Sequence, residues 1–124
     1  ECIARFPDGL ATGAAGWTTA GRLPARWVIH TVGPNHAAGE RDRTLLLSAY
    51  RRSLEVADAL DARSVAFPLI SAGVYGWPKE DAIDAAITAI RSAATQVDEV
   101  RIVAFDSATA ELVQERIRQA ESTV

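Results

Sequence analysis

The first third of the chain contains two short runs of β-prone residues. They cover Ala14 to Thr19 and Trp27 to Val32, and the stretch from Ala20 to Pro24 lies between them. That stretch holds a glycine and a proline, which together mark a turn. We therefore expect two strands joined by a short connection.

Three amphipathic stripes follow. Apolar residues recur at spacings of three and four from Glu40 to Leu60, with charged residues between them, and this pattern predicts a helix. A second stripe begins just after Pro78, which suits a first helical position because its missing N–H would be unpaired there. A last helix is expected over Ala108 to Ser122. The stripes consist of Leu47, Tyr50, Leu54, Ala57 and Leu60, then Ile83, Ala86, Ile87, Ile90 and Ala94, and finally Val113, Ile117, Ala120 and Val124.

Two further strands separate these helices. Ser64 to Ile70 is continuously apolar after its first residue, which predicts a strand covered on both faces near the middle of a sheet. Val100 to Phe105 is a second, mostly apolar strand. The alternation of strands and helices predicts an α/β fold with a largely parallel sheet.

Composition limits the class of protein. A chain of 124 residues is long enough for one domain, and its 48% hydrophobic and 23% charged residues are those of an ordinary globular protein. The longest apolar runs fall far short of the roughly 18 residues that a membrane-spanning helix needs. We expect a single core and no membrane partner.

Charge and cysteine content narrow the expectations further. The net charge is −3, so no global positive field favours nucleic acid, and we expect no sequence-specific nucleic-acid partner. The single cysteine, Cys2, has no intramolecular disulfide partner, and no leader sequence precedes it, so a cytoplasmic location is the expectation. Because no histidine lies near it in the sequence, Cys2 is a weak candidate nucleophile.

The segment from Ala66 to Pro78 is the most informative. A buried strand leads into a loop of small residues and then into a helix, so successive N–H groups can point into one concavity beside a helix N-terminus, as in an anion site. Gly73 and Gly76 permit backbone angles and close approaches that a β-carbon would block. Phosphate is the natural occupant. An ordinary tight connection between strand and helix explains the same residues, and neither the Walker nor the Rossmann glycine pattern is present.

Several nearby side chains have two interpretations. Tyr75 and Trp77 could cover a ribose or stack on a base, or Trp77 could pack under the helix. His30 lies in an apolar strand, where a hydrogen-bonded core role competes with a ligand or catalytic role. His36 lies six residues after His30, and no carboxylate or cysteine stands at the spacing of further metal ligands. We therefore predict no metal site. Arg51 and Arg52 could contact phosphate or simply form a charged helix face.

Three segments give the chain a family resemblance. Gly13-Ala14-Ala15 leading to Thr19, Leu23-Pro24 through Pro34, and Ala66-Phe67-Pro68 through Pro78 resemble the macrodomain family. The match is to bacterial members that remove ADP-ribose or deacetylate O-acetyl-ADP-ribose. The resemblance implies a three-layer α/β/α sandwich with a mixed, largely parallel sheet, which binds ADP-ribose or its derivatives, and with them ADP-ribosylated proteins, without a cofactor.

The resemblance also implies binding residues. The family's second phosphate loop falls on Ser71, Ala72, Gly73, Val74 and Tyr75, whose backbone amides would hold the diphosphate while Tyr75 lies against it and the proximal ribose. Phe105 and Asp106 match a Phe-Asp pair near the adenine and its ribose. Core packing is the alternative role for Phe105.

The chain departs from the family at its start. Macrodomains of this type begin with further strands, an asparagine-rich loop and a first phosphate loop with catalytic residues, and none of these has a counterpart here. The single asparagine, Asn35, matches no catalytic position. We therefore expect residues 1–124 to be the C-terminal portion of one macrodomain, or a natural truncation, with the catalytic residues unknown. A hydrolase in the full-length protein, a non-catalytic ADP-ribose-binding module and a remnant without a ligand all remain open.

One structural expectation follows from the resemblance. In the family a strand lies between those that match Trp27 to Val32 and Ser64 to Ile70, so these two strands lack their shared neighbour here. Each buried, unpaired backbone group costs roughly 1 to 3 kcal/mol. We expect the chain alone to be aggregated or molten, or to acquire the strand from upstream residues or another chain.

Overall fold

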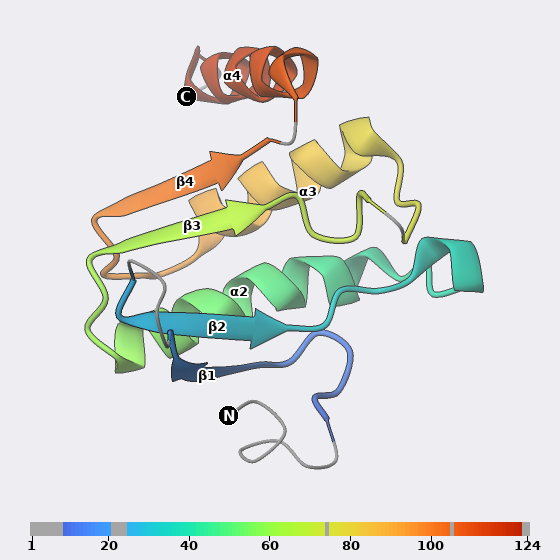
Figure 1. Ribbon diagram of the computed structural model, residues 1–124. Helices are drawn as coiled ribbons and strands as arrows, with labels where there is room; N and C mark the ends of the chain where they lie inside the picture. The colour runs from blue at the N-terminus through green and yellow to red at the C-terminus, as the bar shows by residue number, and fades with distance from the viewer. Residues whose placement is uncertain (1–8, 21–24, 74, 105, 123–124) are drawn as a thin grey trace.

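The computed structural model describes residues 9–20, 25–73, 75–104 and 106–122. Cys2, the turn at 21–24, Val74, Phe105 and Val124 lie outside the described residues, as does the side chain of Ala120. The elements are, in chain order, β1 (Ala15–Thr19), β2 (Trp27–Thr31), the short 3-10 helix η1 (His36–Ala38), α2 (Arg43–Ala59), β3 (Ser64–Pro68), α3 (Lys79–Ser92), β4 (Glu99–Val103) and α4 (Ser107–Ser122) (Figure 1).

Local capping sets where the helices begin. Helix α2 starts at Arg43, three residues later than Glu40, because Asp42 is extended and its carboxylate accepts the N–H of Thr44 at 3.0 Å. Helix α3 starts at Lys79, with Pro78 in the preceding cap position, and ends at Ser92, so Ala94 lies beyond it. The last helix matches its predicted range to within one residue.

The strands form two pairs. β1 runs antiparallel to β2, with Ala15 opposite Thr31, and β3 runs parallel to β4, with Ser64 opposite Glu99. Among the described residues no ladder joins β2 to β3. The α/β class, the mixed strand directions and the parallel pair are confirmed. The expected central position of β3 is not seen within the described chain, because β3 has one neighbour there.

The core lies on one face of the strands. Helices α2 and α3 pack there, and α4 adds Val113 at the β4 side. The buried core side chains of the helices are mainly Leu46, Ala49, Tyr50, Leu54, Ala82, Ile83, Ala85, Ala86 and Ala89. Most of the residues in the two predicted stripes that fall within α2 and α3 are thereby confirmed as core-facing.

The second face of β3 is open. Phe67 is buried against the helices, whereas its neighbours Ala66 and Pro68 and the first residue, Ser64, are exposed. Side chains alternate between the two faces of a strand, and no described helix covers the second face. The prediction that both faces of this strand are covered is therefore wrong for the described part of the chain.

Candidate ligand-binding edge

The loop after β3 has a strained, well-anchored backbone. Ser71 has φ of 67°, in the left-handed region that non-glycine residues rarely adopt, and Gly76 has φ of 73°. The Ser71 carbonyl accepts the N–H of Trp77 at 2.9 Å, and the Gly73 carbonyl accepts the N–H of Gly76 at 3.0 Å. These bonds hold the loop in a tight turn at the carboxyl end of the strand.

Gly33 permits this turn, and the sequence analysis did not single it out. A β-carbon at Gly33 would overlap the hydroxyl oxygen of Ser71 and the Cγ2 atom of Ile70. The segment after β2 therefore approaches the loop more closely than any side chain allows. In the sequence, the one signal for this close approach was a glycine directly before Pro34, at the end of a predicted strand.

Three N–H groups of the loop are candidates for an anion. The N–H of Ala72 is taken by the Leu69 carbonyl at 3.3 Å, but those of Ser71, Gly73 and Tyr75 have no acceptor among the described residues. A β-carbon at Gly73 would meet no atom within 4 Å, so the surface there is open. An open row of N–H donors is the arrangement that anion sites use.

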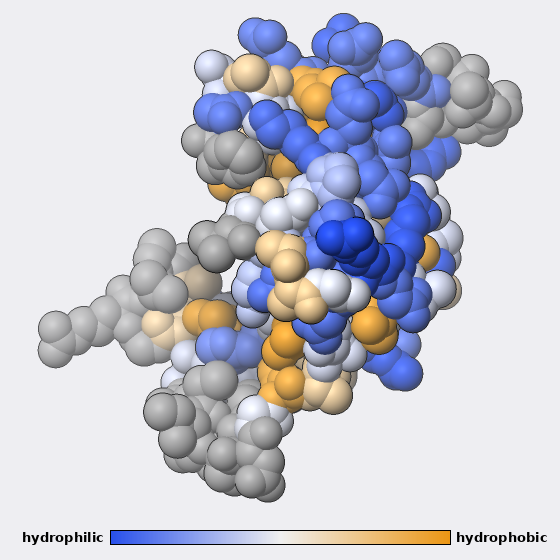
Figure 2. All heavy atoms as spheres, turned by 90° about the vertical axis from the view of Figure 1, so that its right-hand side faces the viewer, coloured by the Kyte–Doolittle hydropathy of each residue, from blue (hydrophilic) through white to orange (hydrophobic). Residues whose placement is uncertain are grey.

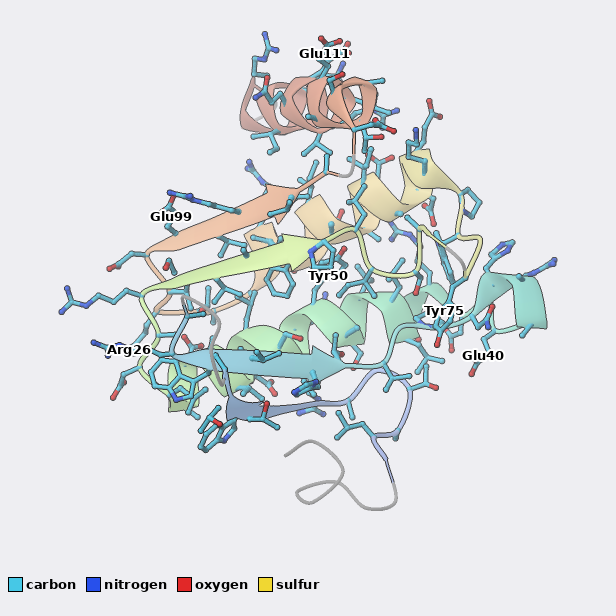
Figure 3. The ribbon with its side chains drawn as sticks, viewed as in Figure 1. Arg26, Glu40, Tyr50, Tyr75, Glu99 and Glu111 are labelled. Atoms are coloured by element: carbon cyan, nitrogen blue, oxygen red, sulfur yellow. The ribbon has the colours of Figure 1, made fainter. Side chains whose placement is uncertain are left out.

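Tyr75 stands at the exposed edge of this loop. Its side chain is 39% exposed, and its carbonyl accepts the N–H of Ala37 at 2.9 Å, which ties the loop to η1. Figure 3 shows Tyr75 at the end of the molecule toward which β3 points. Tyr75 and Ser71 both line a cleft of about 770 Å³ between β2 and β3.

Trp77 packs in the interior. It is 4% exposed, its indole N–H donates to Asp81 Oδ2 at 2.8 Å, and its ring meets the edge of His36 with centroids 5.3 Å apart. The prediction that Trp77 packs under the helix is confirmed.

The helix beside the loop does not offer a free anion site. Glu80 and Asp81 occupy the first turn of α3, and Asp81 also pairs with Arg43 at 3.2 Å. Carboxylates already lie at the positive end of the helix dipole. Any anion on the loop must therefore be held by the N–H groups of the loop. The positive end of the α3 dipole, which the sequence suggested as a second source of attraction, already faces carboxylates.

Asp106 lies at the same edge of the sheet. It follows β4, the parallel neighbour of β3, and its side chain is exposed. The side chain of Thr109 lies beside the Asp106 carboxylate, and the N–H of Thr109 donates to that carboxylate at 2.7 Å. Both contacts lower the pKa of Asp106, and the positive charge of Lys79 lowers it further. Asp106 thus caps α4 whether or not it also contacts a ligand.

The remaining candidates have structural partners. His30 Nε2 lies 2.8 Å from the hydroxyl of Thr18, the hydrogen-bonded role expected of a histidine in a strand. Arg51 and Arg52 are exposed on α2, and Arg52 pairs with Glu55 at 3.0 Å. Asn35 caps η1 through the N–H of Ala38 at 3.2 Å. The arginines therefore form a charged helix face.

Figure 2 looks onto this edge of the molecule, where hydrophilic residues dominate and apolar residues gather in small patches.

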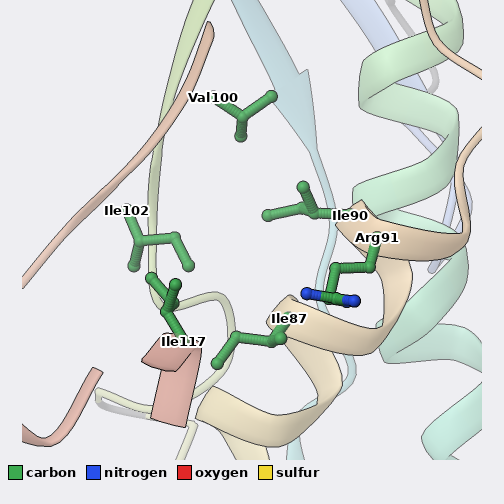
Figure 4. A pocket seen from close by; sticks show the side chains of 6 residues that line it. All are labelled: Ile87, Ile90, Arg91, Val100, Ile102 and Ile117. Carbon is green, nitrogen blue, oxygen red and sulfur yellow. The ribbon is translucent and has the colours of Figure 1, made fainter. Parts of the chain in front are cut away.

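Among the described residues, no group of three or more histidine, cysteine or acidic side chains could hold a metal ion. No described helix is both long and apolar enough to cross a membrane. A second hollow of about 200 Å³ lies away from the loop, between α3, β4 and α4; it is lined by five aliphatic side chains and Arg91 (Figure 4).

Comparison with known proteins identifies the family. The model of the macro domain family, described as "Macro domain", matches residues 2–86. A macro domain-containing protein of Streptomyces nogalater is 53% identical over 111 residues, covering 86% of this chain and 61% of that protein. An O-acetyl-ADP-ribose deacetylase of Klebsiella pneumoniae is 46% identical over 97 residues, covering 75% of this chain and 55% of that enzyme. This chain belongs to the macro domain family.

Solved structures agree with this assignment. A variant of the Oceanobacillus iheyensis macrodomain with ADPR overlays with a TM-score of 0.84 at 33% identity, covering 91% of this chain and 62% of that one. The Trypanosoma brucei macrodomain in complex with ADP-ribose overlays with a TM-score of 0.76 at 31% identity, covering 88% and 47%. The chain has the macrodomain fold, and it spans about three fifths of the length of the first curated relatives it matches.

Proposed function

We propose that this chain binds ADP-ribose or a derivative of it at the carboxyl edge of the sheet. The diphosphate lies on the loop from Ser71 to Tyr75, and the observation that carries this is the row of N–H groups at Ser71, Gly73 and Tyr75 without described acceptors. Backbone N–H donors suit a diphosphate, since hydrogen bonds to a charged acceptor are the strong ones. The ADP-ribose bound by the Trypanosoma relative supports this ligand class.

Other residues of the proposed site contact the nucleoside. Tyr75 lies against the diphosphate and the proximal ribose, and Phe105 and Asp106 lie near the adenine and its ribose. The loop and Asp106 follow neighbouring parallel strands, so they share one edge of the sheet. In open α/β sheets ligands bind at the carboxyl ends of the strands, which supports this placement.

For the full-length protein we propose a hydrolase that removes ADP-ribose from proteins or deacetylates O-acetyl-ADP-ribose. The Klebsiella relative, named for that deacetylation, supports the proposal. A non-catalytic ADP-ribose-binding module is the alternative, because no catalytic residue can be assigned in this chain. Release of acetate from O-acetyl-ADP-ribose, or of ADP-ribose from a modified carboxylate, by the full-length protein tests it. Clear binding without turnover would favour the module.

Substitution of Gly73 tests the binding site. Gly73→Val adds a branched side chain into space where no protein atom lies within 4 Å, so the fold should be retained. The valine should block the diphosphate and weaken ADP-ribose binding, measured by calorimetry, by at least about tenfold, which corresponds to about 1.4 kcal/mol. Thr88→Val, on the exposed side of α3, is the matched control and should bind like the parent. A folded Gly73→Val variant with parental affinity would show that the diphosphate lies elsewhere.

A further inference from the structure

The short helix η1 packs against the loop that follows β3. The N–H of Ala37 donates to the carbonyl of Tyr75 at 2.9 Å. A β-carbon at Gly76 would lie 3.5 Å from the Cβ atom of Ala37, which is ordinary van der Waals contact. The rings of His36 and Trp77 form an edge contact with centroids 5.3 Å apart. η1 therefore contacts the second half of the loop through both backbone and side chains.

These contacts fix the peptide group that joins Tyr75 to Gly76. Its carbonyl accepts the N–H of Ala37, and its N–H donates to the Gly73 carbonyl at 3.0 Å. The C=O and the N–H of a trans peptide point in opposite directions, so the two bonds hold this group from opposite sides. Gly76, with φ of 73°, restricts the backbone less than any other residue would. The bond from η1 therefore decides how this peptide faces, and with it the orientation of Tyr75.

η1 depends on neighbouring side chains for its own position. It spans three residues, and none of them is buried. A single helical turn forms too few hydrogen bonds to offset the entropy lost when its backbone is fixed. Polar side chains supply the missing bonds: the Asn35 side chain accepts the N–H of Ala38 at 3.2 Å, and Arg41 Nε donates to the His36 carbonyl at 3.2 Å.

Glu40 ties η1 to a distant part of the chain. Its Oε1 atom accepts the N–H of Asn35 at 3.1 Å, and its Oε2 atom accepts the hydroxyl of Thr12 at 3.4 Å. The N–H of Glu40 also donates to the Asn35 carbonyl at 2.9 Å. Hydrogen bonds to a charged acceptor are the strong ones. Glu40 thus closes the segment that contains η1 and connects it to the residues before β1; Figure 3 shows Glu40 and Tyr75 at the same end of the molecule.

We propose that Glu40 is a positioning residue for the ADP-ribose site. Its carboxylate holds η1, and the N–H of Ala37 in η1 holds the carbonyl of Tyr75, so the loop is set for the diphosphate and the proximal ribose. The role is indirect, because a carboxylate repels a diphosphate. This inference rests on the proposed function. The connection from Glu40 to the loop does not.

The negative charge of Glu40 gives the test a sign. If Glu40 acted through its charge alone, its removal would strengthen the binding of an anionic ligand. Removal of a positioning residue has the opposite effect, since a loosened loop must be ordered when the ligand binds. A glutamine at this position keeps an oxygen acceptor for the N–H of Asn35 and offers an N–H donor to the hydroxyl of Thr12. It therefore removes the charge and keeps the hydrogen bonds.

Two substitutions in the full-length protein test the proposal by calorimetry with ADP-ribose. Glu40→Ala should weaken binding by about fivefold, the effect expected from the loss of one hydrogen bond. Glu40→Gln should bind within about twofold of the parent, because its amide replaces both contacts. Glu55→Ala removes another exposed glutamate, which pairs with Arg52 on α2, and should bind like the parent. Parental or tighter binding by Glu40→Ala overturns the proposal, as does Glu40→Gln binding as weakly as Glu40→Ala.

Hydrogen exchange tests the route through η1. The amide of Ala37 should be protected in the parent by its bond to the Tyr75 carbonyl. In Glu40→Ala it should exchange at least about fivefold faster, because local opening becomes easier, and in Glu40→Gln it should stay protected. The amide of Ala86, in the middle of α3, should exchange equally in all three proteins and shows that the fold is intact. An unchanged Ala37 amide in Glu40→Ala overturns this route.

The parent protein separates the two proposals. Absence of ADP-ribose binding by the parent would refute the proposed function, and faster exchange of the Ala37 amide in Glu40→Ala would still show that Glu40 holds the loop. Binding by the parent that neither variant changes would leave the proposed function standing and refute the positioning role.

Discussion

Tyr50 links the core to the candidate loop through one side chain. It is fully buried, and its hydroxyl accepts the N–H of Ile70 at 3.0 Å and donates to the Pro68 carbonyl at 3.4 Å. Its ring packs against Phe67 with centroids 5.2 Å apart. Helix α2 thereby fixes the end of β3 directly before the loop begins, so the loop geometry depends on a fully buried residue of the core.

Removing this hydroxyl should destabilise the protein. Tyr50→Phe leaves the N–H of Ile70 buried without its acceptor, which costs about 1 to 3 kcal/mol. Urea unfolding at pH 8 measures the loss. Tyr75→Phe changes the exposed tyrosine and should retain parental stability.

The pH dependence of Tyr50 gives a second readout. Burial raises the pKa of Tyr50 to about 12, although the hydrogen bond from Ile70 opposes the shift. The unfolded chain loses this proton near pH 10 and the folded chain keeps it until about pH 12. Stability is therefore complete below pH 10 and falls as pH rises toward 12, by about 2 to 3 kcal/mol. Parent and Tyr50→Phe variant should converge in stability over this range; parallel curves would contradict the assignment.

At the scale of elements, α4 is held by its first turn and by the ion pairs that Arg116 makes with Asp84 and Glu80 of α3. Asp106 caps the helix through Thr109, and Arg116 donates to both carboxylate oxygens of Asp84 at 2.7 and 2.9 Å. These polar contacts matter because α4 adds few buried side chains to the core.

Two substitutions separate the capping role of Asp106 from a binding role. Asp106→Asn keeps a good capping side chain and should retain the melting temperature, whereas Asp106→Ala should lower it. If Asp106 contacts the adenine ribose, both variants should weaken ADP-ribose binding. Glu111→Ala, on the exposed side of α4, is the control for stability. Parental affinity in Asp106→Asn would restrict the residue to capping.

Asp106 also makes the stability of the protein depend on pH in the acid range. Because the pKa of Asp106 is lowered in the fold, its contribution is present above its usual value of 3.8 and is lost as pH falls through the folded pKa. Thermal melts between pH 5 and about pH 2 should show this loss in the parent, and a smaller one in Asp106→Asn.

At the scale of the whole molecule, the two strand pairs are joined through helices rather than through the sheet. Helix α2 packs against β1, β2 and α3, while β2 and β3 lack a shared ladder among the described residues. Cooperative unfolding requires that the parts of a domain stabilise one another. We therefore expect the two pairs to unfold separately.

Tryptophan fluorescence can measure this directly. Trp17 and Trp27 lie in β1 and β2, whereas Trp77 packs before α3. In a Trp77→Phe variant, the fluorescence should report the unfolding of β1 and β2. In a double Trp17→Phe, Trp27→Phe variant, it should report the unfolding of the region around Trp77. The midpoints of the two thermal transitions should differ by several degrees. Coincident transitions, with calorimetric and van't Hoff enthalpies in agreement, would mean that the chain alone folds as one unit.

Periodicity in the sequence predicted the elements because it is a local property. Tyr50, Leu54 and Ala57 recur at helical spacing and are buried, and the two β-prone runs before them form the antiparallel pair. The sequence pattern placed the start of α2 at Glu40, too early, because charged residues such as Glu40 and Arg41 also fit the polar face of a helix. The extended backbone of Asp42 sets the actual start of the helix at Arg43. The resemblance carried by the three segments up to Thr19, Pro34 and Pro78 led to the correct family.

What the sequence by itself determined is therefore the order and type of the elements, their core-facing residues and the family. Only the tertiary structure decided that Gly33 approaches Ser71, that Asp81 pairs with Arg43, and that the second face of β3 is open. These features join segments that are distant in sequence. An apolar strand has the same pattern whether or not a neighbour pairs with it, because backbone groups carry no sequence signal and the partner is set by the whole fold.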